Sequence, residues 1–393
     1  MKNVYLDNAS TTKIDPEVLD AMLPYLSDRY GNPSSIHLLG HDAKDAVESS
    51  RDRIAASINA RSDELLFTSG GTESNNFALK GVAFANKEKG KHIITSAVEH
   101  KCIINSCKWL ESQGFEITYL PVDSEGFVNS EELKNAIKKE TVLFSVIHGN
   151  NEIGTIQNME ELGKICRDSD IYFHTDACQS YTKTELNVRK FNLDLVTLNA
   201  HKIHGPKGVG ALHVKEGTKI DPWQHGGGQE FRKRGGTENV PGVVGFAKAA
   251  QLNSDKKSII HTSRLRDKLI DGILGIENVR LNGPRSEKRL CNNANFSFLE
   301  IEGEALGAHL EQEGVKTSTG SACSSNTLEK SHVLRAIGLN DEQINGSLRM
   351  SVSRFNTEEE IDYAIEKAGD AAKKLRKISP IKRVVNSVFG KGN

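Results

Sequence analysis

The sequence predicts an α/β protein, in which a large domain with a mostly parallel sheet flanked by helices accompanies a smaller α+β domain. Two observations predict this fold class. From about residue 64 to 215, short runs rich in Val, Ile, Leu and Phe alternate with helical patterns, which is typical of βαβ units with buried parallel strands. The 393 residues also exceed one domain of roughly 150 residues, and further strand and helix patterns follow.

The large domain is expected to contain seven strands, each a short apolar run. They span 64–69, 92–96, 115–122, 141–147, 171–177, 193–200 and 209–214. Helices are expected between them at 72–86, 101–113, 130–139 and 158–168. Because parallel sheets bind ligands at the carboxyl ends of their strands, the polar residues that follow these strands are the first candidates for a site.

The rest of the chain is expected to complete the large domain and to form the small one. The Gly-rich stretch at 223–242 predicts an ordered functional loop. The other expected elements are a helical region at 243–275, helices near 304–313 and 357–377, and a strand at 347–353. We predict a large domain at 15–257, and a small domain that combines 1–14 with 258–393.

The composition excludes several classes of protein. With 51 Lys and Arg against 52 Asp and Glu, the net charge of −1 argues against a general nucleic-acid binder. No apolar run approaches the roughly 20 residues of a membrane span, and the N-terminus carries no signal-peptide pattern. We therefore expect a cytoplasmic protein with neither nucleic acid nor membrane as a direct partner.

The segment TSGGTES (68–74) follows a predicted strand and opens a predicted helix. Gly70 and Gly71 allow the backbone to approach an anion, and the helix N-terminus offers unpaired N–H groups. The same residues also fit an ordinary glycine turn with Thr72 as the helix N-cap. Because neither G-x-G-x-x-G nor G-x-x-x-x-G-K-[ST] occurs, a dinucleotide or Walker phosphate site is disfavoured.

Two further polar residues stand at strand ends. Asp176 ends the strand at 171–177, where a carboxylate can cap a helix or hold a positively charged ligand nitrogen. Lys202 follows the strand at 193–200, and is either exposed or, if desolvated, a Schiff-base nucleophile. A phosphate cradle, a strand-end acid and a strand-end lysine together fit pyridoxal 5′-phosphate (PLP), which needs these three groups.

The six cysteines are irregularly spaced and do not indicate a disulfide framework. Cys323 lies among Gly, Ser, Thr and Ala, which predicts a mobile, accessible loop at about 317–330. The others are expected to be small buried hydrophobes, namely Cys102, Cys107, Cys166, Cys178 and Cys291. The spacing of His100, Cys102 and Cys107 matches no standard zinc pattern, so no metal site is expected.

Eleven motifs make the sequence look familiar. They are YLDNASTT (5–12), GNPSS (31–35), FTSGGTESNN (67–76), EHK (99–101), NNEIG (150–154), DACQS (176–180), HKIHGPKG (201–208), HGGGQE (225–230), TGSACSS (319–325), HVLRAIGL (332–339) and RMSVSRFNTEEEID (349–362). By these motifs the chain resembles the cysteine desulfurases of the NifS/IscS type, which are class V aminotransferases of PLP fold type I.

The resemblance implies an activity and a set of partners. It implies a homodimer that converts L-cysteine to L-alanine and holds the sulfur as a persulfide on Cys323. The sulfur would serve iron–sulfur cluster assembly and tRNA thiolation, through an iron–sulfur scaffold protein or another acceptor. Cys323 could also be a transient iron–sulfur ligand. The alternatives are a selenocysteine lyase, another fold type I PLP enzyme such as an aminotransferase, and a non-catalytic assembly scaffold.

The resemblance also implies roles for the residues that act on the cofactor ring. Lys202 would bind PLP and move the α-proton of the substrate. Asp176 would pair with the ring nitrogen, and Gln179 would face the phenolic oxygen. His100 would stack on the ring and assist proton transfer.

Phosphate and substrate binding are implied in the same way. The phosphate would be held by Gly71, Thr72 and His201, and by Thr237 from the neighbouring subunit. Arg349 and Asn151 would bind the substrate carboxylate. Two residues depart from the family pattern: Asn199 stands where a serine usually donates to the phosphate, and Lys330 stands where relatives often have proline.

Overall fold

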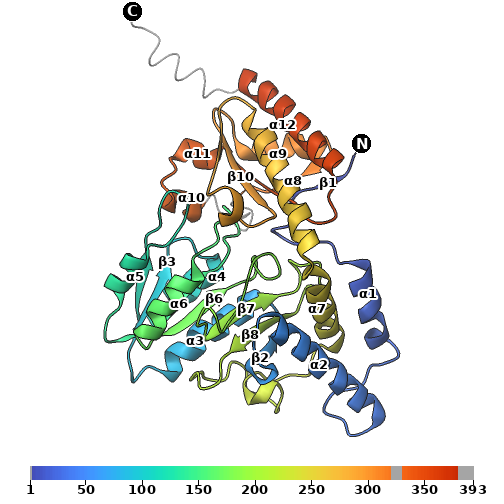
Figure 1. Cartoon of the computed structure of the whole chain (residues 1–393), viewed down its shortest axis with the longest axis vertical. Coiled ribbons are helices and arrows are strands. Elements are labelled where there is room, and N and C mark those ends of the chain that lie inside the picture. The colour runs from blue at the N-terminus through green and yellow to red at the C-terminus, as the bar shows by residue number, and fades with distance from the viewer. Residues whose placement is uncertain (1, 320–329, 379–393) are drawn as a thin grey trace, which may run out of the picture.

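The computed structural model describes residues 2–319 and 330–378, and its largest sheet has seven strands (Figure 1). Their spatial order is β2 (Leu65–Thr68), β8 (Gly210–Val214), β7 (Leu195–Asn199), β6 (Tyr172–Asp176), β5 (Thr141–Ile147), β3 (His92–Ser96) and β4 (Glu116–Leu120). Neighbouring strands pair in parallel, except that β8 is antiparallel to both β7 and β2. The predicted mostly parallel sheet is confirmed.

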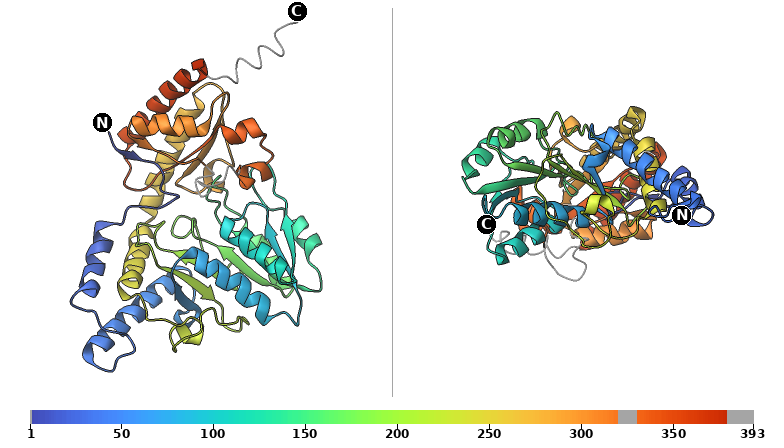
Figure 2. Two further views of the ribbon diagram at one scale, coloured as in Figure 1. Left: turned by 180° about the vertical axis from the view of Figure 1, so that it is seen from behind. Right: turned by 90° about the horizontal axis from the view of Figure 1, so that it is seen from below.

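Helices cover both faces of this sheet (Figures 1 and 2). One face packs against α1 (Pro16–Met22), α2 (Leu38–Ser57), α5 (Ser130–Ala136), α6 (Met159–Asp168) and α7 (Val240–Asn253). The other face packs against α3 (Gly71–Ala85) and α4 (Lys101–Ser112). Successive strand residues serve opposite faces, so that Phe67 joins the first core and Leu66 the second.

A second, smaller sheet has the antiparallel order β12 (Ser347–Ser351), β10 (Asn293–Phe298) and β9 (Val279–Leu281). The helices of this part are α8 (Lys256–Leu274), α9 (Gly303–Gln312), α10 (His332–Ala336), α11 (Asp341–Asn345) and α12 (Glu358–Ile378). Near the N-terminus, β1 (Val4–Tyr5) pairs in parallel with β11 (Val315–Lys316), and Val4 joins the core of this smaller part. The boundary at residues 257 and 258 stays a prediction.

Two helix predictions need correction. The helix expected at 130–139 ends at Ala136, because the backbone of Ile137 is already extended. The helical region expected at 243–275 is two helices, because Asp255 caps a new helix by accepting from the backbone N–H of Lys257. Across the described ranges, no helix has the length and apolar character that a membrane crossing requires.

Candidate active site

A cavity of about 270 Å³ lies at the carboxyl ends of the central strands, where the smaller sheet meets the larger one. Ile147, Asp176 and Asn199, the last residues of β5, β6 and β7, line it from one side, and Arg349 of β12 lines it from the other. Ten of the predicted site residues line this single cavity: Gly71, Thr72, His100, Asn151, Asp176, Gln179, Asn199, His201, Lys202 and Arg349.

The N-terminus of α3 opens onto the cavity through a glycine pair. Gly70 has a φ of 153°, which L side chains rarely adopt, and Gly71 has no room for a side chain. A Cβ on Gly71 would lie 2.4 Å from Sγ of Cys178. The amide nitrogen of Asn199 lies 3.5 Å from that same Cβ position, so it stands beside the helix N-terminus. Backbone N–H groups of α3 and this amide together make a donor-rich corner that suits an anion.

Asp176 is held as a buried carboxylate by two donors. One oxygen accepts from the amide of Asn75 at 2.7 Å, and the other accepts from the backbone N–H of Cys178 at 2.9 Å. Sequence analysis missed Asn75, although it stands four residues after Gly71 and therefore on the same face of α3. Asp176 thus both closes the turn after β6 and presents its charge to the cavity.

His100 is the N-cap of α4, and its Nδ1 accepts from the backbone N–H of Cys102 at 3.3 Å. Burial lowers the pKa of His100, and the charge of Lys202 lowers it further, so the imidazole is neutral at pH 7. Cys102 corrects an expectation: it is only half-buried and lines the cavity, with Sγ 2.9 Å from Nδ1 of His100. The other four cysteines outside the Cys323 loop are buried, as expected.

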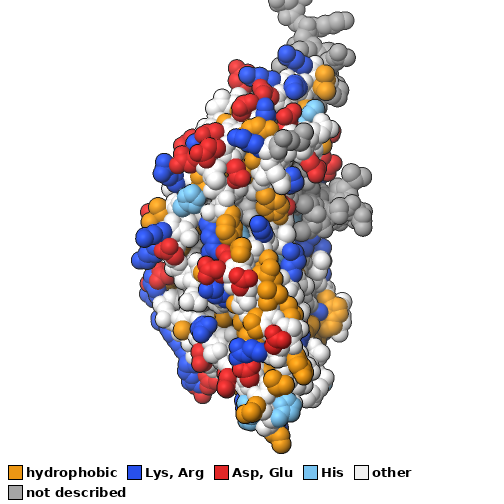
Figure 3. All heavy atoms as spheres, turned by 90° about the vertical axis from the view of Figure 1, so that its right-hand side faces the viewer, with side chains coloured by type: hydrophobic (Ala, Val, Ile, Leu, Met, Phe, Trp, Pro, Cys, Tyr) orange, Lys and Arg blue, Asp and Glu red, His pale blue; other side chains and the backbone are white. Residues whose placement is uncertain are grey.

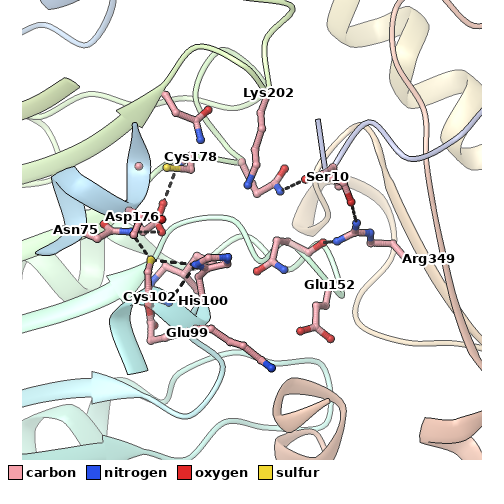
Figure 4. Close-up of a pocket in the computed structure, with 18 of the residues that line it drawn as sticks. Ser10, Asn75, Glu99, His100, Cys102, Glu152, Asp176, Cys178, Lys202 and Arg349 are labelled. Carbon is pink, nitrogen blue, oxygen red and sulfur yellow. Dashed lines mark hydrogen bonds between the residues drawn. The ribbon is translucent and has the colours of Figure 1, made fainter. Parts of the chain in front are cut away.

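Lys202 follows β7 in a turn, and its side chain projects into the cavity (Figure 4). In the neighbouring residue His201, Nδ1 lies 3.2 Å from the hydroxyl oxygen of Thr11. Burial lowers the pKa of His201 to about 4, with further lowering from the charges of Lys202 and Lys207. His201 is therefore neutral at pH 7 and can contribute a hydrogen bond to this wall.

Arg349 is 5% exposed, and most of its guanidinium is already engaged. Nη2 donates to the carboxylate of Asp7 at 3.1 Å and to the hydroxyl of Ser10 at 2.7 Å, and Nη1 donates to the carbonyl of Asn151 at 3.0 Å. Within the described part of the chain, Nε of Arg349 and Oδ1 of Asn151 are buried without a partner. The guanidinium is therefore fixed in orientation and keeps an unused donor.

Glu99 is a buried cavity residue that sequence analysis missed. One oxygen accepts from Ser96 at 2.5 Å and from the backbone N–H of Ile147 at 2.9 Å, and the other has no partner among the described residues. Burial raises the pKa of Glu99 to about 8, against the lowering by these two donors, and the charge of Asp176 raises it further. The carboxyl therefore stays protonated at pH 7.

The remaining predicted residues are placed as follows. The Gln179 amide donates to the carbonyl of Ala9 at 2.8 Å at the cavity wall. Thr237 is exposed in the segment before α7 and does not line the cavity of its own chain, so its expected role toward a neighbouring subunit stays a prediction. Cys323 lies outside the described residues. Lys330 lines the cavity and forms an ion pair of 2.8 Å with Asp341.

Known proteins are similar to this chain over nearly its whole length. The cysteine desulfurase IscS of Methanosarcina thermophila is 49% identical over 97% of this chain and 94% of its own length. That of Dictyoglomus turgidum is 52% identical over 97% of this chain and 98% of its own. A solved structure described as a NifS-like protein has a TM-score of 0.89 at 36% identity, covering 95% of this chain and all of that one (100%).

Two further findings complete the comparison. A structure of SspA in complex with cysteine has a TM-score of 0.81 at 36% identity, covering 90% of this chain and 100% of that one. The family described as aminotransferase class-V matches residues 4–364. The resemblance stated from the motifs is confirmed, and the chain belongs to the aminotransferase class-V family.

Proposed function

We propose that this chain is a PLP-dependent cysteine desulfurase, which converts L-cysteine to L-alanine and holds the sulfur as a persulfide on Cys323. The observation that carries the proposal is the convergence of Lys202, Asp176, His100 and Arg349 on one cavity. Relatives that carry this name and match nearly the whole chain support the same activity.

The residues present fit PLP by the chemistry of their donors and acceptors. Lys202 offers an amine for the aldehyde, and the carboxylate of Asp176 offers a partner for a protonated ring nitrogen. The N–H groups of α3, with Thr72 and His201, offer donors for the phosphate. When bound, PLP supplies an electron sink that stabilises negative charge at the substrate α-carbon.

Substrate binding is assigned to Arg349 and Asn151. A guanidinium suits a carboxylate because its N–H groups match the two oxygens, and Arg349 is already held in orientation by Asp7 and Ser10. The buried, unpartnered Nε of Arg349 then gains a partner from the substrate. A fixed carboxylate brings the α-carbon to a defined place beside Lys202, which takes up the α-proton as an amine base.

The sulfur transfer is assigned to Cys323. Its thiolate attacks the sulfur of the substrate, the carbon–sulfur bond breaks, and the electron pair stays on the substrate carbon. That carbon takes up a proton and leaves as alanine, while Cys323 keeps the sulfur as a persulfide. Since L-cysteine and one thiol become L-alanine and one persulfide, the step needs no further oxidant or reductant. The outer sulfur of the persulfide then passes to an acceptor, which we take to be an iron–sulfur scaffold protein in the cytoplasm.

A second copy of the chain is part of the proposal. Figure 3 shows hydrophobic side chains gathered on the face where α1 and the start of α2 lie. Exposed apolar residues of this segment include Leu23, Leu26, Tyr30, Ile36 and Leu38. An uncovered apolar surface of this kind is typical of an interface, which supports a homodimer in which Thr237 reaches the neighbouring site.

The test is alanine release from L-cysteine by the PLP-reconstituted protein, with Lys202→Ala alongside. We expect alanine from the parent, and none from the variant above the background of free PLP, because the variant lacks the amine that binds PLP and moves the proton. If a fully PLP-loaded parent releases no alanine from L-cysteine, the proposal is wrong. Release from L-selenocysteine alone would favour the lyase, and a colourless protein that takes up no PLP would favour the scaffold.

A further inference from the structure

Four side chains form one hydrogen-bonded chain beside the cavity (Figure 4). The amide nitrogen of Asn75, which donates to Asp176 at 2.7 Å, also lies 3.1 Å from Sγ of Cys102. Sγ of Cys102 in turn lies 2.9 Å from Nδ1 of His100. The chain therefore connects the carboxylate at the end of β6, through α3, to the imidazole that caps α4.

The direction of the contact between Cys102 and His100 follows from the other bonds. Nδ1 of His100 already accepts from the backbone N–H of Cys102, so it carries no proton. An unprotonated ring nitrogen only accepts, and the thiol must therefore be the donor in the bond to Nδ1. The contact with Asn75 fits this direction. The amide N–H of Asn75 donates to a lone pair of the sulfur, which leaves the thiol proton of Cys102 for His100.

The electrostatics of the site agree with a protonated thiol and a neutral imidazole. Burial, with the charge of Asp176, raises the pKa of Cys102 to about 12, so the sulfur keeps its proton at neutral pH. Burial is also the main reason that the pKa of His100 is lowered. The charged and titratable groups that act on this imidazole from the surrounding elements are Lys202, Asp176, His332 and Lys101.

We propose that Cys102 is a positioning residue, which donates its thiol proton to Nδ1 of His100 and so reinforces the neutral imidazole, with its proton on Nε2, that the backbone N–H at the start of α4 already selects. The catalytic role that this proposal assigns to His100 rests on the function proposed above. An imidazole fixed in this form offers an N–H donor rather than a lone pair. His100 is then set to supply a hydrogen bond or a proton to the substrate, and does not compete with Lys202 for the α-proton.

Two variants of Cys102 test this proposal in the full-length protein. Cys102→Ala removes the donor, whereas Cys102→Ser keeps a hydroxyl donor at the same position. Cys107→Ala is the matched control, because Cys107 is fully buried on the same helix and does not line the cavity. The readout is nitrogen NMR of protein labelled at its histidine rings and titrated over pH, with His100→Gln identifying the His100 signals.

In the parent and in Cys107→Ala, we expect the ring nitrogens of His100 to report a proton on Nε2. In Cys102→Ala, the backbone N–H of residue 102 still donates to Nδ1, so the tautomer should stay the same. We expect protonation of His100 at higher pH, because one of the two bonds that favour the neutral ring is lost. Cys102→Ser should restore the parent titration. The acidic limb of kcat/KM for alanine release should move in the same direction as the NMR titration.

The proposal is overturned if the parent carries the proton on Nδ1, or if His100 titrates alike in the parent and in Cys102→Ala. A proton on Nδ1 in the parent overturns the proposal even if Cys102→Ala does not fold, and Cys102→Ser then supplies the second titration. Because the NMR readout needs no turnover, a failure of the proposed desulfurase activity would leave it unchanged, and the two failures are distinguishable.

Discussion

The hydrogen bonds around Arg349 fix the orientation of its guanidinium in the cavity wall. Two nitrogens of its guanidinium donate to Asp7, Ser10 and Asn151 of the chain itself. These bonds hold the planar group in one orientation before any substrate binds. A lysine at this position has neither the length nor the fork to make these bonds and bind a carboxylate at once. The residue therefore contributes both a charge and a fixed direction.

We predict that Arg349→Lys raises KM for L-cysteine about ten- to a hundredfold and changes kcat much less. Bonds to charged groups contribute about 1.5 to 3 kcal/mol, and about 1.4 kcal/mol corresponds to a factor of ten in affinity. Steady-state alanine release measures both constants. Arg335→Lys, an exposed arginine paired with Asp341, is the control and should match the parent. An unchanged KM for Arg349→Lys would exclude this carboxylate site.

Glu99 gives a prediction about stability and pH. Its carboxyl loses its proton near pH 8 in the fold, but near 4.5 when unperturbed, as in an unfolded chain. Between these two values the folded state binds the extra proton, so the free energy of unfolding decreases as the pH rises from about 4.5 to about 8. Glu99→Gln removes this decrease, because the amide does not titrate.

Urea unfolding at pH 5 and pH 8 checks the prediction. The free energy of unfolding of Glu99→Gln, taken relative to that of the parent, should be higher at pH 8 than at pH 5. Glu116→Gln is the control, because its exposed carboxylate bonds to Lys138, which lowers its pKa, and no such gain is expected. Equal pH dependence in the parent and in Glu99→Gln would show that Glu99 is ionised in the fold.

At this scale, the sequence predicts residues that follow a recognisable strand. Asp176 and Lys202 could be found in this way, because the carboxyl ends of parallel strands meet at one edge of the sheet. Asn75 and Glu99 could not, because a helix face and a buried loop turn toward a ligand only once the elements pack. Cys102 was expected in the core for the same reason, since its helix position looks apolar in the sequence.

At the scale of elements, the Gly-rich stretch at 223–242 is tied to the sheet by a buried ion pair. Glu230 accepts from Arg51 of α2 at 2.7 Å and from the backbone N–H of Phe67 in β2, and both charged side chains are nearly inaccessible. Glu230, Phe231 and Arg232 all have positive φ, so the backbone bends sharply here. The ion pair holds this bend in place, close to the strand that leads into the anion-binding corner at Gly71.

We predict that Glu230→Gln lowers the free energy of unfolding by about 3 kcal/mol, because it leaves the buried guanidinium of Arg51 with only the half-exposed Glu48 as a charged partner. Urea unfolding measures the loss. Glu48→Gln is the matched control: Glu48 also pairs with Arg51, but it is half exposed, and its loss should be below about 1 kcal/mol. Equal effects of the two variants would contradict the proposed importance of the buried pair.

The elements differ in how well the sequence predicts them. The seven strands of the large sheet could be predicted, because six are almost entirely buried runs and the edge strand β4 is a short run of strand-forming residues. Helix α2 was missed although it has 20 residues, because half of its buried face is alanine and glycine and it also buries Ser50 and Arg51, which gives a weak apolar periodicity. The two-residue strands β1 and β11 and the five-residue helices α10 and α11 are too short to show any period.

At the scale of the whole molecule, the N-terminal segment connects the two parts of the structure. Val4 pairs with Val315 in the smaller part, while the hydroxyl of Thr12 donates to the carbonyl of His201 in the larger part at 2.8 Å. Between them, the backbone N–H of Ala9 donates to Ser351 at 2.8 Å. The cavity is assembled from distant segments in this way, and no local sequence pattern could predict its shape.

The most direct test of the central claim is to follow sulfur and carbon together in one turnover. The PLP-loaded parent and Cys323→Ala are each mixed with L-cysteine without reductant, and alanine is measured with the mass of the peptide that contains Cys323. We predict one alanine for each persulfide on Cys323 in the parent, and neither product in the variant. Alanine in equal amounts from both proteins would contradict the claim that Cys323 accepts the sulfur.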